Sequence, residues 1–418
     1  MPAGIRRASL PVLVGIGKQI GRTKHECRRR LQSTDEVLVY TGQFCSRAFK
    51  TLDSHNWVSL CMGRISLIQS RNMKNDHPLV SIVVPCRNEE DHIGTALDEI
   101  LAQDPPLGGF EVIVADGMSN DGTREIVLQK ALTDSRIRMI DNQVGFVSNG
   151  LNAAIREAKG SIIVRMDAHT SYATDYVYRC VEVMKETGAE NVGGPWIACG
   201  KGKIGKAIAA AFQSPFSCGG ARGHDANYSG PVDTVYLGCW RREIFDRIGW
   251  FDEELVRNQD DEFNLRIVRS GGKVWQSTKI RSCYVPRESL CDLFAQYLQY
   301  GYWKARVLQK HRLPASYRHL VPAGFLCALV LLPIISIFWS RAIWIWVNLL
   351  GFYFTLSILL SLVTASMTGW KLFPLLPPVF WTFHLAYGWG FLRGFADFIV
   401  LRRKRREAYI ALTRASSE

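Results

Sequence analysis

Short apolar runs alternate with helical patterns from about residue 78 to residue 190. Strands are predicted at 79–85, 110–115, 136–140 and 161–166, and helices at 91–102, 123–132, 149–158 and 176–186. Continuous apolar strands separated by helices are typical of a mostly parallel sheet with helices on both faces and right-handed crossovers. The pattern therefore predicts an α/β fold.

Polar residues stand where three of these strands end. Arg87 and Glu89 follow the first strand, Asp116 closes the second, and Asp167 and His169 close the strand at 161–166. Open α/β sheets bind ligands at this carboxyl edge. Neither a P-loop nor a G-x-G-x-x-G fingerprint is present, so side chains would read a base or ribose. A nucleotide cleft is predicted.

Asp167 and His169 occupy alternate positions in the segment MDAHT. A carboxylate and an imidazole so placed can share a divalent cation that holds a diphosphate, and the imidazole mildly favours Mn²⁺ over Mg²⁺. The alternative is a strand followed by a turn that begins with Asp.

Further along, the glycine-rich stretch 193–238 is expected to form mobile loops, which often act as substrate lids.

Three consecutive acids, Asp260, Asp261 and Glu262, open a predicted helix. Acids in a first helical turn are favoured by the helix dipole, which is the structural interpretation. Acids packed together beside a cleft are also what a general base with a raised pKa requires. Both interpretations stay open at this point.

The C-terminal third is apolar. An aromatic helix is predicted at 290–308, followed by uncharged stretches at 321–339 and 343–367 and a proline-broken one at 372–392. The first two are long enough to span a bilayer. The basic run 402–406 favours a cytoplasmic C-terminus. Two spans plus an interfacial or re-entrant third segment satisfy that orientation. The aromatic helix could alternatively be an interfacial belt of Tyr and Trp with Lys and Arg anchors.

Charge and cysteine usage narrow the class of protein. The 418-residue chain has a formal net charge of +13, which suggests an anionic partner such as a phosphorylated molecule or the inner face of a membrane. No nucleic-acid-binding motif is present. The 11 cysteines include no C-x-x-C pair, and their odd number fits reduced thiols in a cytosolic domain. Residues 1–77 are expected to be a poorly ordered basic extension, with a surface-lying anchor as the alternative.

Five motifs in order resemble a known family. SIVVPCRNEE, VIVADGMSNDGT, MDAH, DDEFNLR and QYLQYGYWK together resemble an inverting family 2 glycosyltransferase with a GT-A fold. The MDAHT form and the apolar segments after it are most similar to the membrane-bound exopolysaccharide branch, the ExoA-type succinoglycan glucosyltransferases. The resemblance covers about residues 78–310.

The resemblance implies roles for particular residues. Those expected to bind a nucleotide sugar, probably UDP-linked, are Pro85, Arg87, Glu89, Asp116 and Asp167, with Asp116 on the uracil. Asp167 and His169 would hold Mn²⁺ or Mg²⁺. Asp260 would be the catalytic base, and the residues expected to hold the acceptor and diphosphate are Gln296, Gln299, Tyr300 and Trp303.

Three departures from the family pattern matter. Gln259 replaces a Glu, so Asp261 or Glu262 could share the role of the base. His169 replaces the last Asp of D-x-D. Gln299 replaces an Arg, which puts processive synthesis in doubt.

The resemblance also implies a function and a domain plan. A hexose, glucose by expectation, would pass from a UDP-sugar to a hydroxyl of a lipid-linked saccharide in exopolysaccharide biosynthesis at the inner membrane, where other polysaccharide-assembly enzymes could be partners. The alternatives are a sugar nucleotidyltransferase on a related fold and a non-catalytic membrane-associated binding protein. The expected plan is a catalytic domain facing the cytoplasm (78–312), a multi-pass membrane region (313–401) and a basic cytoplasmic tail (402–418).

Overall fold

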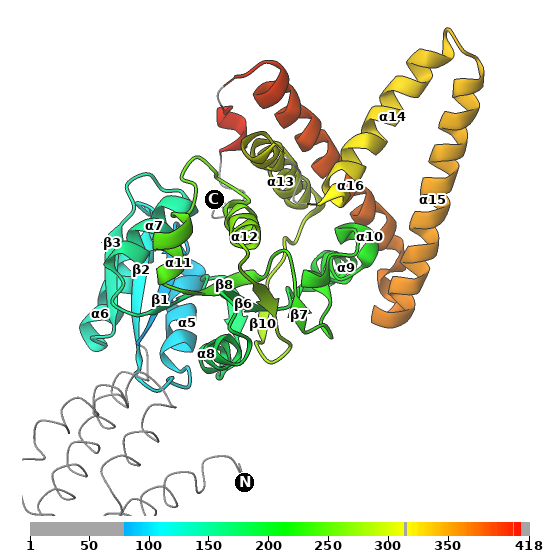
Figure 1. Ribbon diagram of the computed structural model, residues 1–418. Helices are drawn as coiled ribbons and strands as arrows, with labels where there is room; N and C mark the ends of the chain where they lie inside the picture. Colours follow the sequence, from blue (N-terminus) through cyan, green and yellow to red (C-terminus); the bar gives the residue numbers. More distant parts are fainter. Residues whose placement is uncertain (1–78, 313–315, 404, 411–418) are drawn as a thin grey trace, which may run out of the picture. The chain divides into compact units, whose positions relative to one another are not determined.

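The protein is described by a computed structural model, which covers residues 79–312, 316–403 and 405–410 (Figure 1). The extension predicted for residues 1–77 lies outside the described residues. An eight-stranded sheet in the order β3-β2-β1-β4-β8-β6-β9-β7 forms the centre of the α/β region, residues 79–312.

The first four strands are parallel neighbours, as the apolar runs predict. They are β1 (Val80–Cys86), β2 (Phe110–Asp116), β3 (Ile137–Asp141) and β4 (Ile162–Arg165). Along β1, Ile82 and Val84 pack on one face of the sheet and Val83 packs on the other. Because both faces are covered, these strands are apolar throughout.

Helices cover both faces of the sheet. One face packs against α5 (Glu90–Leu101), α6 (Thr123–Thr133) and α8 (Tyr176–Thr187). The other packs against α7 (Val147–Glu157), α11 (Glu243–Ile248) and α12 (Gln259–Arg269). Helices α5, α6, α7, α8 and α12 agree with the predicted helices within a few residues, because their apolar positions repeat with helical spacing.

The second half of the sheet is mixed. It contains β6 (Asn191–Gly194), β7 (Gly230–Pro231), β8 (Tyr236–Arg241) and β9 (Val274–Gln276). Strand β8 runs antiparallel to both β4 and β6, whereas β9 is parallel to β6. A separate two-stranded sheet pairs β5 (Thr170–Tyr172) with β10 (Ser282–Tyr284), which places β10 beside the segment that follows His169.

The glycine-rich stretch 193–238 is not a set of loops throughout, so that expectation is wrong in part. It contains α9 (Gly202–Phe212), α10 (Pro215–Cys218) and the 3₁₀ turn η1 (Arg222–His224). The segment Ala207–Ala211 is rich in alanine, the residue with the highest helix propensity, and it is buried. Burial of this face stabilises a helix that its glycines would otherwise disfavour.

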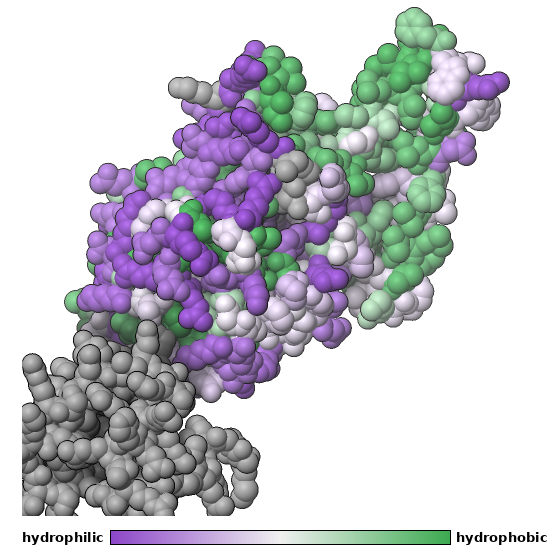
Figure 2. Space-filling view, in the orientation of Figure 1, coloured by the Kyte–Doolittle hydropathy of each residue, from purple (hydrophilic) through white to green (hydrophobic). Residues whose placement is uncertain are grey.

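The C-terminal region is helical. Its elements are α13 (Leu290–His311), η2 (Tyr317–Leu320), α14 (Val321–Ser336), α15 (Arg341–Thr368), η3 (Trp370–Leu375), α16 (Leu376–Phe395), the π-helical turn η4 (Ala396–Val400) and η5 (Glu407–Tyr409). Among the described residues, two helices, Tyr317–Ser336 and Arg341–Thr368, are long and apolar enough to cross a membrane. Figure 2 shows hydrophobic residues covering this helical pair, while the α/β region is mostly hydrophilic on the face in view.

Helix α16, the third predicted hydrophobic segment, packs closely against α13. A Cβ atom on Gly390 would lie 2.0 Å from the carbonyl oxygen of Leu298, and one on Gly301 would lie 2.0 Å from that of Tyr387. Such close backbone approach requires glycine at the contact. The helix that carries the predicted acceptor residues is therefore held by the C-terminal helix.

The expectation of reduced thiols is not met throughout the described part of the chain. Cys199 and Cys283 form a disulfide with their Cα atoms 5.8 Å apart. They are 84 residues apart in sequence, so no local spacing indicated the pair. The bond joins the segment before α9 to β10.

Candidate active site

Asp167 lies at the carboxyl end of β4 and is 7% exposed. Arg165 donates to it from Nε to Oδ1 at 2.7 Å and from Nη2 to Oδ2 at 2.8 Å. The backbone N–H of Asp167 donates to the hydroxyl of Tyr172 at 2.6 Å. A two-pronged contact with a guanidinium fixes the plane of a carboxylate as well as its position. Asp167 is therefore held in one orientation at the edge of the sheet.

His169 and Glu89 lie together because β1 and β4 are parallel neighbours. His169 Nδ1 is 3.4 Å from Glu89 Oε1. Among the described residues, no three His, Cys, Asp or Glu side chains form a metal site of their own. A carboxylate and an imidazole with phosphate oxygens completing the shell would fit Mg²⁺ or Mn²⁺, which are often bound in this way.

Asp116, at the end of β2, is fully buried and has several donors. Arg124 Nη1 donates to Oδ2 at 2.6 Å, and the Ser119 hydroxyl donates to Oδ1 at 2.5 Å. Arg87 lies nearby, since a Cβ on Gly145 would be 2.5 Å from its Nη1. Pro85 pairs with Ala115 in the register of β1 and β2. These residues share one end of the sheet, and their contact with a nucleotide stays a prediction.

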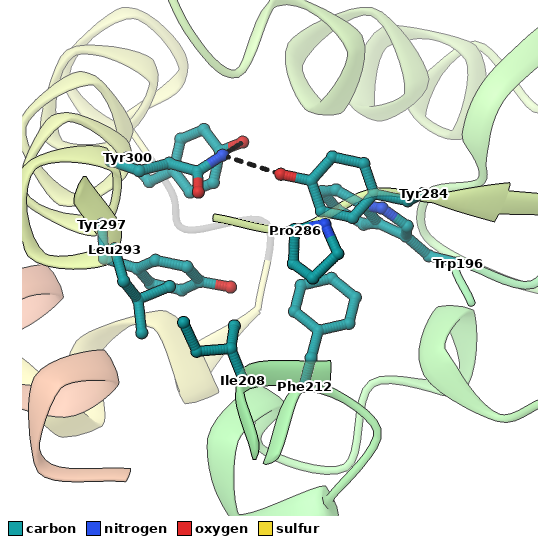
Figure 3. A pocket seen from close by; sticks show the side chains of 9 residues that line it. Trp196, Ile208, Phe212, Tyr284, Pro286, Leu293, Tyr297 and Tyr300 are labelled. Carbon is teal, nitrogen blue, oxygen red and sulfur yellow. Dashed lines mark hydrogen bonds between the residues drawn. The ribbon is translucent and has the colours of Figure 1, made fainter. Parts of the chain in front are cut away.

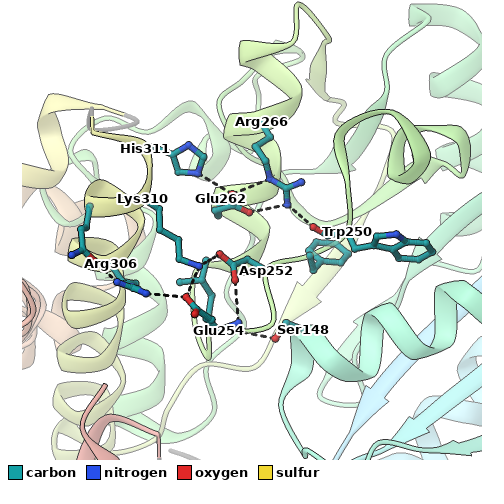
Figure 4. Close-up of polar contacts among 12 residues, drawn as sticks. Ser148, Trp250, Asp252, Glu254, Glu262, Arg266, Arg306, Lys310 and His311 are labelled. Atoms are coloured by element: carbon teal, nitrogen blue, oxygen red, sulfur yellow. Dashed lines mark hydrogen bonds and ion pairs between the residues drawn. The ribbon is translucent and has the colours of Figure 1, made fainter. Parts of the chain in front are cut away.

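Glu262, the last of the three consecutive acids, is paired with two side chains. It is 3% exposed, and Arg266 contacts its carboxylate at 2.9 Å through Nε and Nη2. His311 Nε2 lies 2.8 Å from Oε1 (Figure 4). Arg266 also donates to the carbonyl oxygens of Ile248 and Trp250. Glu262 thus joins α12 to α13 and to the end of α11, which is a structural role.

Asp261 is paired with a lysine that lies in the middle of α13. Lys304, which is 6% exposed, donates from Nζ to Asp261 Oδ2 at 2.5 Å. Burial alone would raise the pKa of Asp261, but the charge and hydrogen bond of Lys304 outweigh it and lower the pKa. Asp261 is therefore held as a paired carboxylate.

Asp260 differs from both neighbours. Its Oδ1 accepts the backbone N–H of Asp261 at 2.9 Å, and none of the described side chains forms an ion pair with it. Burial and the negative charge of Asp261 raise the pKa of Asp260, while Arg165 and Lys304 act in the opposite direction. A raised pKa in a half-buried carboxylate is what a general base near neutral pH requires.

The predicted acceptor residues on α13 have different surroundings. Gln296 Nε2 donates to the hydroxyls of Tyr284 and Tyr300 at 3.1 and 3.0 Å. Gln299 accepts a hydrogen bond from Arg257 Nε at 3.1 Å. Trp303 is 1% exposed and donates from Nε1 to the carbonyl oxygen of Tyr409 at 2.9 Å, so the structure gives it a packing contact with the C-terminal segment.

Tyr284 connects the strand-end residues with α13. Its ring centroid is 6.2 Å from that of His169, and its hydroxyl accepts from Gln296. Asn258, at the start of α12, donates to the carbonyl oxygen of Tyr300 at 2.9 Å. Arg165, the partner of Asp167, acts electrostatically on Asp260. The strand ends, α12 and α13 thus meet at one place.

A pocket opens beside this junction. It encloses about 220 Å³, counting the part open to solvent. Figure 3 shows aromatic side chains converging on it from α9, α13 and β10. The Tyr284 hydroxyl accepts a hydrogen bond from Gln296 at its edge. Its lining residues are Trp196, Ile208, Phe212, Tyr284, Pro286, Leu293, Gln296, Tyr297 and Tyr300.

Three residues of the site were missed by sequence reasoning: Arg165, Tyr284 and Lys304. Lys304 had been considered only as an interfacial anchor, although a lysine inside an apolar helical stripe is itself a signal, because buried lysines are nearly always paired. Arg165 stood inside the motif VRMDAH without an assigned role. Tyr284 had no sequence signal, since its place depends on the pairing of β10 with β5.

The fold and the strand-end site define a nucleotide-sugar transferase of GT-A type. Residues 81–249 match the family model "Glycosyl transferase family 2". The chain is 34% identical over 243 residues to the succinoglycan biosynthesis protein ExoA of Rhizobium meliloti (strain 1021), covering 58% of this chain and 73% of that protein. The chain belongs to glycosyltransferase family 2, and the predicted enzyme class and fold are confirmed.

Two further relatives extend the comparison. A dolichyl N-acetyl-alpha-D-glucosaminyl phosphate 3-beta-D-2,3-diacetamido-2,3-dideoxy-beta-D-glucuronosyltransferase of Methanococcus voltae is 26% identical over 324 residues, covering 75% of this chain and 96% of that protein. The solved mannosyltransferase PcManGT from Pyrobaculum calidifontis, in complex with GDP-Man and Mn²⁺, aligns with a TM-score of 0.50 at 19% identity, over 76% of this chain and 86% of its own. The solved structure supports the GT-A fold.

Proposed function

We propose that the protein transfers a hexose, glucose by our prediction, from a UDP-sugar to a hydroxyl of a lipid-linked saccharide during exopolysaccharide synthesis. The two sequence relatives support a saccharide product and a lipid-linked acceptor, because one is named for succinoglycan biosynthesis and the other for a dolichyl phosphate sugar. The two apolar helices support an acceptor held in the inner leaflet. We place the catalytic domain on the cytoplasmic side, where the basic tail also lies by the charge rule.

The observation that carries the chemistry is how the three acids are paired. Glu262 is held by Arg266 and His311, and Asp261 by Lys304. Asp260 alone combines a raised pKa with no ion pair among the described residues. We therefore assign Asp260 as the base and Asp261 as the residue that raises its pKa.

In the proposed reaction, Asp260 takes the proton of the acceptor hydroxyl while that oxygen attacks the anomeric carbon. The bond from the anomeric carbon to the diphosphate breaks on the opposite face, so the anomeric configuration inverts. Glycosyl transfer of this kind passes through an oxocarbenium-like transition state. A divalent cation bound by Asp167 and His169 would offset charge on the departing diphosphate.

Arg165 orients the metal-binding end of this site. Its contact with Asp167 is buried, so losing the guanidinium would remove a two-pronged charge partner from a carboxylate in a poorly solvated place. The same arginine lowers the pKa of Asp260, against the effects of burial and of Asp261, and so favours the ionised carboxylate. Arg165 therefore links the donor side of the site to the base.

The decisive experiment measures release of UDP from a panel of nucleotide sugars. Membranes with and without the expressed chain are supplied with Mn²⁺ and a lipid extract that contains the acceptor. We expect one donor to be cleaved, with more turnover in the presence of the lipid extract than of a soluble sugar. Equal turnover with soluble sugars would refute a lipid-linked acceptor, and absence of UDP release from every donor would refute the assigned chemistry.

A further inference from the structure

We propose that the first turn of α9, together with η3, contacts the anionic headgroups of the membrane and sets the depth of the active site. This "α9 surface" consists of Lys201, Lys203, Ile204, Lys206, Trp370 and Lys371. It deepens the proposed function, because it rests on insertion of the apolar helices.

The lysines of the α9 surface are exposed and have no partner within the described part of the chain. Lys201, Lys203 and Lys206 carry neither an ion pair nor a side-chain hydrogen bond there, and Ile204 beside them is 37% exposed. Some exposed lysines elsewhere, such as Lys279 and Lys310, are paired with acids. Unpaired exposed lysines also occur elsewhere, but on the α9 surface three of them stand within six residues. One acid, Glu288, borders the surface, since its Cγ lies 3.9 Å from a Cβ placed on Gly205. The surface therefore keeps a net positive charge.

The buried face of α9 fixes the direction of these lysines. Ala207, Ile208 and Phe212 belong to a core with Val379 and Phe380 of α16. Hydrophobic residues of η3, at the end of α15, pack against the same core: Leu372, Phe373 and Leu375. Helix α9 is thus attached through its apolar face to the end of a candidate span. The lysines at its start lie outside that contact.

The length of α15 indicates the depth of this attachment. Its 28 residues give about 42 Å at the rise of an α-helix. That exceeds the hydrocarbon core of roughly 30 Å and matches the core plus headgroup layers of about 40–45 Å. The helix therefore ends at the level of the headgroups on the side of the catalytic domain, where Trp370, 62% exposed, and Lys371 follow. Trp and Lys are the residues that anchor span ends at this level.

Contact with anionic lipids also explains how the pocket meets its acceptor. Ile208 and Phe212, on the same helix as the lysines, line the pocket with Tyr297 and Tyr300 of α13. Each basic residue near an anionic surface strengthens binding on the order of fivefold at moderate salt. Three lysines on one turn would therefore hold α9, and the pocket it lines, at headgroup height, where the saccharide of a lipid-linked acceptor begins.

The first test is a chemical footprint of the full chain in nanodiscs. One nanodisc is pure phosphatidylcholine and the other contains phosphatidylglycerol, and acetylation of each lysine is followed by mass spectrometry. We expect acetylation of Lys201, Lys203, Lys206 and Lys371 to slow several-fold in the anionic nanodisc and to recover at high salt, because screening weakens contacts with exposed charges. Rates that are equal in the two nanodiscs would overturn the proposal.

Control lysines are available in the same molecule. Lys159, Lys185 and Lys273 are exposed on the catalytic region and make no ion pair with a described residue. Their acetylation is expected to be equal in both nanodiscs. A similar slowing of acetylation at these three lysines would mean that the whole domain lies on the lipid. It would overturn the proposal that the α9 surface makes the contact.

The second test separates the α9 surface from the chemistry. The triple variant Lys201→Gln, Lys203→Gln, Lys206→Gln is compared with Lys159→Gln, Lys185→Gln, Lys273→Gln. We expect the first to keep wild-type UDP release in detergent but to lose its stimulation by phosphatidylglycerol, and the second to keep both. Stimulation retained by the first variant would refute the proposal. Absence of UDP release from the wild type would instead count against the proposed function, and the footprint would still test the surface.

Discussion

Lys304 of α13 donates a hydrogen bond to Asp261 of α12, and the next acid along, Asp260, has no such partner among the described residues. Of two adjacent aspartates, Asp261 is thus paired with a buried lysine and Asp260 is the candidate base. Burial and the charge of Asp261 raise the pKa of Asp260, whereas Arg165 and Lys304 lower it. The charge that pairs with Asp261 and also acts on Asp260 thus comes from Lys304, which is 43 positions from Asp261 in sequence.

This arrangement predicts how pH affects the rate. The base acts when ionised, so kcat/KM is expected to fall as the pH drops through a value above the ordinary 3.8 of an aspartate. Lys304→Met removes a charge that lowers the pKa of Asp260, and the acid limb moves to higher pH. Asp261→Asn removes a charge that raises it, and the limb moves to lower pH. Lys304→Arg, which keeps the charge, should leave the limb in place.

The measurement is the pH profile of kcat/KM for UDP release from the four proteins. A merely structural role for Lys304 would lower activity equally at every pH. An acid limb that stays at the same pH in both charge-removing variants would exclude Asp260 as the titrating group.

Asp260→Asn is expected to reduce turnover by about 10² to 10⁴-fold, the usual contribution of a positioned base. Binding of UDP, measured by calorimetry with Mn²⁺, should stay near the wild-type value because the proposed role of Asp260 is to take the proton of the acceptor and not to hold the nucleotide. The matched control is Asp246→Asn on α11, an exposed acid without an ion pair in the described region. Wild-type turnover in Asp260→Asn would show that another residue is the catalytic base.

The strand-end half of the site was predictable because it depends on local pattern. Apolar runs mark the strands, and Arg87, Glu89, Asp116, Asp167 and His169 follow directly from where each run ends. Parallel pairing then brings those ends to one edge of the sheet. The contact between His169 and Glu89 is the outcome of that rule.

The helical half of the site was not predictable in the same way. The residue pattern alone does not distinguish Asp260, Asp261 and Glu262, and the family resemblance named Asp260 while leaving a shared role open. The contacts of Lys304 and Arg266 with the other two acids distinguish them in the structure. The disulfide between Cys199 and Cys283 likewise depends on distant segments meeting. Helix α9 was not predicted because its glycines have low helix propensity. The apolar face that stabilises the helix becomes evident only when its burial against other segments is known.

A metal prediction follows from the imidazole in the motif. His169→Ala is expected to raise the Mn²⁺ concentration needed for half-maximal UDP release at least tenfold, the low end of the usual loss when ligation is disturbed. His169→Asp should restore activity and shift the preference towards Mg²⁺, since a carboxylate is the harder ligand. Chelation with EDTA should abolish UDP release in all three proteins. Equal Mn²⁺ dependence of the wild type and His169→Ala would remove His169 from the metal site.

The packing of α16 on α13 yields a prediction about stability. Gly390→Ala would place a Cβ atom 2.0 Å from the carbonyl oxygen of Leu298, so the two helices must separate locally. Overpacking of this kind typically costs about 1–3 kcal/mol. The melting temperature of the purified protein should fall, and kcat should fall with it, because α13 carries both Gln296 and Lys304. In the control Gly351→Ala, the new methyl group meets no described atom within 4 Å, and the melting temperature is expected to stay level or rise. Equal behaviour of the two variants would mean that α16 does not support the helix on which the acids are arranged.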